Sequence, residues 1–242
     1  MLTTFESEVA MIHSDPEPGR HRHESLSAAE AIVRRRATRR FDLDRPLPDA
    51  LLARILHLAT FAPSGFNLQP WRFLVVRSAA NRRKLRGCAF NQPKVTEAPV
   101  VVIVLGYQTP DRSHLLPMIE RMQSLGVIDS DAAAELVGRA RAAFERIPDR
   151  ALWATRSTML AASTLMLAAE SLGVASAPME GFDERKVKDA FGIPDDHSVC
   201  CLIALGFAAE EKPFPGRFGL EEVCFLEHFG QPWTLGDTEE RP

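Results

Sequence analysis

Ala62-Pro63-Ser64-Gly65-Phe66-Asn67-Leu68-Gln69-Pro70-Trp71 is the stretch around which this chain is organised. Its two prolines, glycine and asparagine exclude a continuous helix. Apolar segments flank it on both sides, which indicates a turn between a helix and a buried strand. Such a turn presents backbone amides and short polar side chains, and these suit it to hold a planar polar ligand. The alternative interpretation is a simple helix-to-strand connector.

The composition is that of an ordinary globular protein. Of the 242 residues, 45% are hydrophobic and 25% are charged, enough for a buried core. A formal net charge of -3 offers no attraction to nucleic acid or to a membrane surface. No apolar run is long enough to span a bilayer, and the first residues lack the apolar stretch of a signal peptide. We therefore expect a cytoplasmic protein that binds neither nucleic acid nor membrane.

Residues 1–25 are polar and contain two prolines and a glycine, which predicts a flexible N-terminal arm. His21 and His23 lie there without a third ligand nearby, and no metal site is expected. Residues 26–242 show no internal repeat and no convincing linker, so they are interpreted as one α+β domain. Within it, residues 107–150 break into helical pieces, which indicates a lid or a peripheral excursion.

Local signals predict where several elements begin. Ser27 and Glu30 have the pattern of a capping box, and Pro48-Asp49 and Asp183 are typical helix starts. Apolar runs predict strands at 73–76, 99–106, 174–179, 198–206 and 223–226. The runs at 99–106 and 198–206 are apolar on both faces and should be buried inside the sheet.

A long helix is predicted over Leu152–Leu172, ended by Gly173. Apolar and small residues occupy most of its circumference, so it must be covered on nearly all sides. It is either the core helix of the domain or a helix that packs against a second subunit.

Five arginines lie within the seven positions from Arg34 to Arg40. A charge run of this kind is usually a solvated face. This one follows a predicted helix end, where cations suit the helix dipole, and guanidinium groups match the geometry of a phosphate. The run is therefore either a wet surface or an anion site.

Four segments occur in order at suitable separations: Arg35-Arg36-Ala37-Thr38-Arg39-Arg40-Phe41, the turn 62–71, Phe90-Asn91 with Lys94, and Pro178-Met179-Glu180-Gly181-Phe182-Asp183. Together, over about residues 27–226, they resemble the FMN-dependent NAD(P)H nitroreductase family. The resemblance implies an α+β fold with a central mixed β-sheet flanked by helices, in an intertwined homodimer with FMN at the subunit interface. It also implies that a C-terminal strand near 223–226 reaches across to the partner.

The resemblance assigns roles to the basic run and to a later arginine. Arg35 holds the FMN phosphate in this assignment, Arg39 approaches the pyrimidine edge of the flavin, and Arg36 belongs to the same run. Ala37 stands where the family usually has serine, so only a backbone contact remains there. Arg217 aligns with a second phosphate-binding arginine.

The remaining cofactor-binding positions come from three segments. Asn91 and Lys94 match residues that hydrogen-bond the flavin edge, and the backbone amides of Glu180 and Gly181 face the ring near N5. The turn covers the flavin from the other subunit through four residues: Pro63, Ser64, Gly65 and Asn67.

The implied function is reduction of nitroaromatic or quinone-type acceptors with NAD(P)H, by ping-pong hydride transfer through FMN. A cation such as Lys94 or Arg39 stabilises the negative charge of the reduced flavin. No catalytic side chain and no metal is assigned. The alternatives are divergent flavin chemistry on the same fold (reductive dehalogenation, flavin breakdown or FMN-dependent dehydrogenation) and a flavin-binding protein without turnover.

Overall fold

The computed structural model describes residues 26–233, so the expected N-terminal arm, with His21 and His23, lies outside the described residues. The chain divides into two compact units, Met1–Glu210 and Glu211–Pro242. The sequence interpretation placed no boundary between them.

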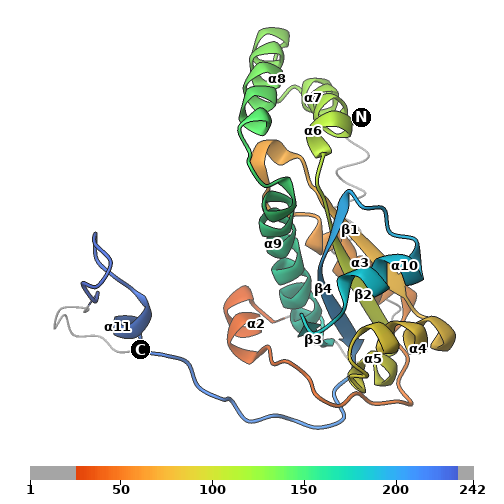
Figure 1. Ribbon diagram of the computed structural model, residues 1–242. Helices are drawn as coiled ribbons and strands as arrows, with labels where there is room; N and C mark the ends of the chain where they lie inside the picture. The colour runs from red at the N-terminus through yellow and green to blue at the C-terminus, as the bar shows by residue number, and fades with distance from the viewer. Residues whose placement is uncertain (1–25, 234–242) are drawn as a thin grey trace. The chain divides into compact units, whose positions relative to one another are not determined.

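A four-stranded β-sheet forms the centre of the first unit (Figure 1). Its strands lie in the order β1-β2-β4-β3: β1 (Trp71–Val76), β2 (Val100–Tyr107), β4 (His197–Gly206) and β3 (Ala175–Met179). The expected inner strands are confirmed, because β2 and β4 occupy the two middle positions. All three pairings are antiparallel, which corrects the expected mixed sheet. Within residues 26–233 the only parallel pairing is the isolated bridge between Ala37 and Ser176.

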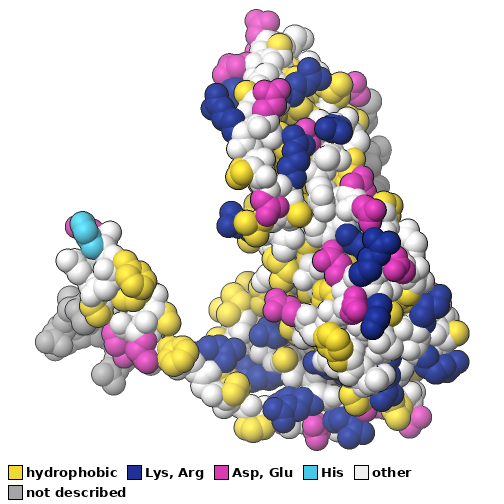
Figure 2. Space-filling view, in the orientation of Figure 1, with side chains coloured by type: hydrophobic (Ala, Val, Ile, Leu, Met, Phe, Trp, Pro, Cys, Tyr) yellow, Lys and Arg dark blue, Asp and Glu magenta, His cyan; other side chains and the backbone are white. Residues whose placement is uncertain are grey.

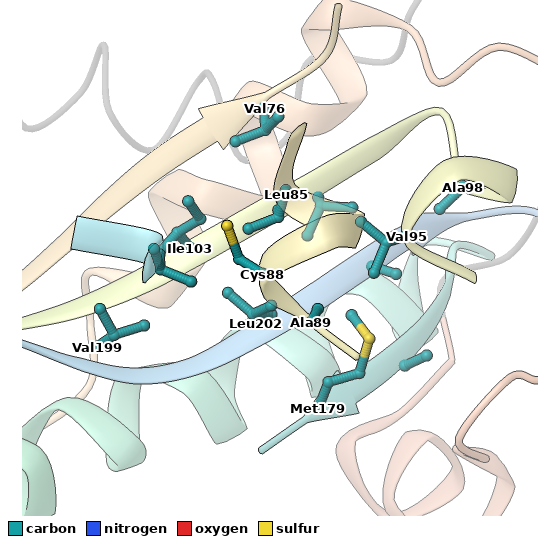
Figure 3. Close-up of a cluster of buried hydrophobic side chains, with 14 of the residues drawn as sticks. Val76, Leu85, Cys88, Ala89, Val95, Ala98, Ile103, Met179, Val199 and Leu202 are labelled. Carbon is teal, nitrogen blue, oxygen red and sulfur yellow. The ribbon is translucent and has the colours of Figure 1, made fainter. Parts of the chain in front are cut away.

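Helices cover both faces of the sheet (Figure 1). One face carries α3 (Asp49–Ala59) and α9 (Arg150–Ser171), and the other carries α4 (Ala79–Cys88), α5 (Lys94–Glu97) and α10 (Glu184–Phe191). Between the sheet and the helices α4, α5 and α10 lies a layer of buried apolar side chains, called here the second core layer. In it Val76, Ile103 and Leu202 of the strands meet Leu85 and Cys88 of α4 (Figure 3). These buried apolar contacts hold α4 and α5 on the sheet.

The local start signals are confirmed. Ser27 caps α2 (Ala28–Arg34): its hydroxyl accepts from the Glu30 amide at 3.3 Å, and the Glu30 carboxylate accepts from the Ser27 amide at 2.9 Å. Asp183 caps α10 by accepting from the Lys186 amide at 3.1 Å. Helix α3 begins at Asp49, directly after Pro48.

The expected excursion consists of three helices beyond one end of the sheet: α6 (Pro110–Ser113), α7 (Leu115–Ser124) and α8 (Ser130–Glu145) (Figure 1). It has an apolar cluster of its own, in which Leu115, Ile119 and Phe144 pack around Leu68. An ion pair of 2.7 Å between Asp111 and Arg150 joins its first helix to the start of α9.

Among residues 26–233, helix α9 is covered on one side only. Its sheet-facing residues, among them Ala161 and Leu165, are buried, whereas Leu152 and Leu160 are 44% and 48% exposed. The expectation that nearly all sides are covered is therefore not met by residues 26–233 of one chain.

In the second unit the strand expected at 223–226 is not formed: Val223 is the last residue of α11 (Leu220–Val223), and Cys224 follows in an extended conformation. The Glu222 carboxylate accepts from the Gly219 amide at 2.8 Å, and acidic residues suit the first turn of a helix. Phe225 then makes only an isolated antiparallel bridge to Pro232. The four-residue apolar run is therefore divided between a helix end and an isolated bridge, because so short a run specifies no regular structure by itself.

No helix within residues 26–233 is long and apolar enough to cross a bilayer.

Candidate functional site

A cationic pocket of about 270 Å³ lies where the basic run meets α5. It is lined by Arg39, Arg40, Gln92, Pro93, Lys94 and Glu97. The structure thus brings together two predicted site residues, Arg39 and Lys94, from segments far apart in the chain. Three cations against one carboxylate leave the pocket positively charged, and Figure 2 shows Lys and Arg side chains gathered over the part of the molecule that carries α2, α4 and α5.

Glu97 holds the two sides of this pocket together. Its Oε1 lies 3.1 Å from Arg40 Nε, and its Oε2 accepts from the Phe41 amide at 3.4 Å. The Phe41 ring is buried in the second core layer, which anchors the end of the basic run. Arg39 is therefore presented from a segment that is tied both to the sheet and to α5.

The loop before α5 has an unusual backbone. Phe90 and Asn91 both have left-handed φ angles, +48° and +57°, which are strained for residues with a side chain. Arg86 stabilises this conformation: its carbonyl accepts from the Asn91 amide at 3.0 Å, and its Nε donates to the Asn91 carbonyl at 3.1 Å. Strain of this kind persists where the surroundings impose it, and it is common at ligand sites.

Gln92 joins this loop to the segment that follows β3. Its Nε2 donates to the Gly181 carbonyl at 2.8 Å. A side chain at Gly181 would begin 3.3 Å from the same Nε2, so the close approach favours glycine there. The predicted residues Asn91, Lys94, Glu180 and Gly181 are thereby placed in neighbouring segments.

The other predicted members of the basic run lie at the end of α2. Arg36 Nη1 donates to the carbonyls of Val33, Arg34 and Arg35 at 2.6, 3.0 and 3.1 Å, and so caps the helix. Arg35 Nη1 is buried and has no hydrogen-bond partner among residues 26–233. Buried guanidinium nitrogens normally donate a hydrogen bond, so this one could donate to an anionic group of a ligand.

The carboxyl of Glu170 in α9 lies near the basic run. Burial raises its pKa, and the charges of Arg35, Arg36 and Arg34 partly oppose the rise.

The backbone next to Ala37 is held by a hydrogen bond, because the Thr38 amide donates to the Ser176 carbonyl at 3.0 Å. Ala37 itself is exposed.

The turn is also tightly built. The Ser64 hydroxyl accepts from the Gln69 amide at 2.9 Å, and Phe66, Asn67 and Gln69 all have left-handed φ angles. The turn contacts the excursion and α9. In the excursion, Met118 Sδ of α7 accepts from Asn67 Nδ2 at 3.3 Å, and in α9 the ring of Trp153 lies next to Gly65. None of the turn's residues lines the cationic pocket of the same chain. Pro63, Ser64, Gly65 and Asn67 therefore form a second group of predicted site residues.

Arg217 belongs to the second unit. Its Nη1 donates to the Gly216 carbonyl at 2.6 Å, and its guanidinium lies 5.2 Å from the ring centre of Phe214. Its phosphate-binding role stays a prediction.

Four residues of the pocket were not predicted as site residues: Arg40, Gln92, Pro93 and Glu97. Arg40 belonged to the quoted basic run, and Gln92 and Pro93 stood between Asn91 and Lys94, so these three carried a signal. Glu97 carried none, because its importance lies in contacts with residues more than 50 positions away.

The pocket can hold an anionic or electron-rich planar group. Cations at its wall stabilise negative charge that develops on a bound ring. Within residues 26–233 no cluster of His, Cys, Asp or Glu is arranged to hold a metal ion.

Known proteins resemble this chain over most of its length. The model of the nitroreductase family matches residues 32–207. A protein of Thermus thermophilus named NADH dehydrogenase is 38% identical over 82% of this chain and 95% of its own length. YdgI of Bacillus subtilis, provisionally named an NAD(P)H nitroreductase, is 30% identical over 81% of this chain and 95% of its own.

A nitroreductase-fold protein of Exiguobacterium sibiricum, solved in complex with FMN, superposes with a TM-score of 0.79 at 24% identity, covering 85% of this chain and 99% of its own. This likeness supports the fold. On the match of the family model to residues 32–207, the chain belongs to the nitroreductase family.

Proposed function

We propose that this protein is an FMN-dependent oxidoreductase that uses NAD(P)H to reduce nitroaromatic or quinone-type acceptors. The observation that carries the proposal is the cationic pocket, in which Arg39 and Lys94 converge beside the segment of Glu180 and Gly181. The names of the relatives in Thermus thermophilus and Bacillus subtilis support the use of a nicotinamide donor. The FMN complex of the Exiguobacterium sibiricum protein supports the cofactor.

The residues present fit FMN. Its ring carries electron-rich edges that suit Arg39 and Lys94, and its phosphate suits the buried Nη1 of Arg35, which has no hydrogen-bond partner in the described part of the chain. Arg217 is proposed as a second phosphate ligand. Asn91 offers an amide to the ring edge, and the exposed Glu180-Gly181 backbone offers amide donors.

When bound, FMN supplies hydride transfer between NAD(P)H and the acceptor. The chain positions the ring, and Arg39 and Lys94 favour its negatively charged reduced form. Because donor and acceptor use the same open face in turn, we expect ping-pong kinetics. No side chain is assigned as a general acid.

We further propose a homodimer that completes the site. The pocket of one chain, about 270 Å³, lies just below the usual range of ligand pockets, about 300–1,000 Å³. Leu152 and Leu160 of α9 and Ile32 and Val33 of α2 leave an apolar surface that a second copy would bury. In this arrangement the Pro63–Asn67 turn of one chain covers the flavin held by the other.

The test is direct. The purified chain should be yellow, should have the mass of a dimer in solution, and should lose its flavin absorbance when NADH or NADPH is added without oxygen. A nitroaromatic or a quinone should then restore the colour. Protein that is colourless, takes up no FMN and leaves NAD(P)H unoxidised contradicts the proposal, whereas flavin that binds but is never reduced indicates a binding protein without turnover.

A further inference from the structure

The turn that carries Pro63–Asn67 is strained, and the contacts that hold it come chiefly from one region. Three of its residues with side chains, Phe66, Asn67 and Gln69, have φ angles of +53°, +53° and +46°. Such angles persist only where the surroundings impose them. The apolar part of the restraint is Leu68, which is fully buried in the cluster of the excursion.

A polar contact that reaches the backbone of the turn from the excursion is made by His114, between α6 and α7. Its Nδ1 lies 2.8 Å from the carbonyl oxygen of Leu68 in the turn, and its Nε2 is in contact with Nη2 of Arg72 at the start of β1. Both ring nitrogens are therefore engaged, one by the turn and the other by the sheet.

This geometry determines the protonation state of the ring. A guanidinium can only donate, so Nε2 of His114 must accept from Arg72. Nδ1 then carries the proton and donates it to the Leu68 carbonyl. Only the neutral imidazole satisfies both contacts, because a second proton on Nε2 would point at the positively charged Arg72.

The groups that surround the imidazole make a proton on Nε2 still less favourable. Tyr107 at the end of β2 lies 5.4 Å away between ring centres, and it stacks at 4.9 Å on His197 of β4, whose Nδ1 is bound by Asp196 at 2.7 Å. Ser113 Oγ donates to the Tyr107 hydroxyl at 3.3 Å. Burial lowers the pKa of His114, the charges of Arg72 and His197 lower it further, and the bond to Leu68 opposes them. The one carboxylate among these groups is already bound to His197.

We propose that His114 is a positioning residue for the turn: its neutral ring links the Leu68 carbonyl of the turn to Arg72 of β1, and a proton on Nε2 breaks the contact with Arg72 and so loosens the turn from the sheet. Residues 107–150 thus act as a clamp on the flavin-covering turn. The effect on the flavin rests on the proposed function, whereas the clamp itself rests on the contacts of one chain.

The variants that test this differ only at the ring. His114→Ala removes the donor, whereas His114→Asn keeps an amide N–H near the position of Nδ1 and does not titrate. His197→Asn is the matched control, because it removes the neighbouring histidine of the same aromatic cluster and leaves the contact with the turn intact.

Two measurements are made on the full chain between pH 5 and pH 8. In the chain without FMN, NMR of the imidazole nitrogens should show His114 neutral with its proton on Nδ1 at pH 7, and amide exchange at Gln69 should speed up as His114 becomes protonated. Exchange rates are corrected for the intrinsic effect of pH. In the loaded chain, FMN dissociation constants are measured by fluorescence.

At pH 7, His114→Ala should weaken FMN binding about fivefold to tenfold, as expected for the loss of one buried hydrogen bond. His114→Asn should recover most of the affinity, and His197→Asn should not change it. Between pH 7 and pH 5 the wild type should lose more affinity than His114→Asn. The FMN phosphate itself titrates in this range, but its effect is the same for both proteins, so the comparison between them removes it.

The outcomes separate the two ideas. A His114 that is protonated on Nε2 at pH 7, or turn exchange that does not respond to its titration, overturns the clamp. A chain that binds FMN equally well with and without the His114 side chain overturns the link to the flavin and leaves the proposed function standing. A chain that binds no FMN at all contradicts the proposed function, and the NMR measurements still decide whether the clamp exists.

Discussion

Gln92 Nε2 donates a hydrogen bond of 2.8 Å to the Gly181 carbonyl, and this contact joins two segments that lie 89 residues apart in the chain. One segment contributes Lys94 to the cationic pocket, and the other contributes the amides proposed to face the flavin. The bond therefore sets the spacing between a cation and a row of backbone donors. Gln92 can therefore affect FMN binding through the position of the Gly181 backbone.

Gln92→Ala should weaken FMN binding about fivefold, because the two segments lose the hydrogen bond that fixes their separation. Fluorescence titration with FMN measures the change. Gln108→Ala is the matched control, since it removes a comparable side-chain bond, 3.1 Å to Ser198 Oγ, that is not part of the pocket. Equal affinities for the two variants would show that the spacing is set elsewhere.

Arg35→Ala should raise the FMN dissociation constant about tenfold or more, because the phosphate loses a charge-assisted hydrogen bond. Arg34→Ala, an exposed neighbour in the same run, should change it little. Riboflavin lacks the phosphate and should bind both variants alike. Arg217→Ala is expected to behave as Arg35→Ala does; if neither variant affects FMN, the phosphate lies at another position.

Ala37→Ser should strengthen FMN binding about fivefold by restoring the hydroxyl that the family usually places there. The backbone is already held by the Thr38–Ser176 bond, and the Ala37 side chain is exposed, so a hydroxyl can be added without steric conflict. The affinity is measured by the same titration, with Ala29→Ser on the exposed face of α2 as the control. An unchanged dissociation constant would place the hydroxyl away from the ligand.

Glu170→Gln should change the pH dependence of stability. The pKa of this carboxyl is raised above its ordinary value of 4.5, so the folded chain holds the proton more tightly than the unfolded chain. Its stabilising contribution is present below pH 4.5 and is lost as the pH rises through the folded pKa. Glutamine does not titrate. As the pH rises above 4.5, the free energy of unfolding of Glu170→Gln should therefore fall less than that of the wild type.

Urea unfolding between pH 4 and pH 8 measures the effect, with the exposed Glu120→Gln as the control. A profile for Glu170→Gln that runs parallel to that of the wild type would mean that the carboxyl titrates alike in both states.

Leu160→Arg should convert the proposed dimer into monomers, because a charge would have to be buried in an apolar interface. Leu160 is 48% exposed in one chain, on the outward side of α9. Leu125→Arg, at a residue 59% exposed after α7, is the control. Light scattering gives the mass; a wild type that is already monomeric would refute the dimer.

The candidate site was only partly visible in the sequence. Arg39, Lys94 and Gly181 were picked out by motif, and the structure brings their segments together. Glu97 was not, since a glutamate in a short helix carries no local mark of its bonds to Arg40 and Phe41. The strand expected at 223–226 was wrong: Val223 ends α11 and Phe225 forms only an isolated bridge, because a run of four apolar residues specifies no regular structure by itself.

By itself the sequence determined the elements whose signals are local. The Ser27 capping box, the helix start after Pro48 and the two largely apolar inner strands could be read directly, because caps and periodicity depend on residues a few positions apart. Only the tertiary structure decided the antiparallel strand order, the pairing of Gln92 with Gly181 and the grip of His114 on the turn. The two side-chain bonds join residues that lie 89 and 46 positions apart, and their energy appears only when packing brings the partners together.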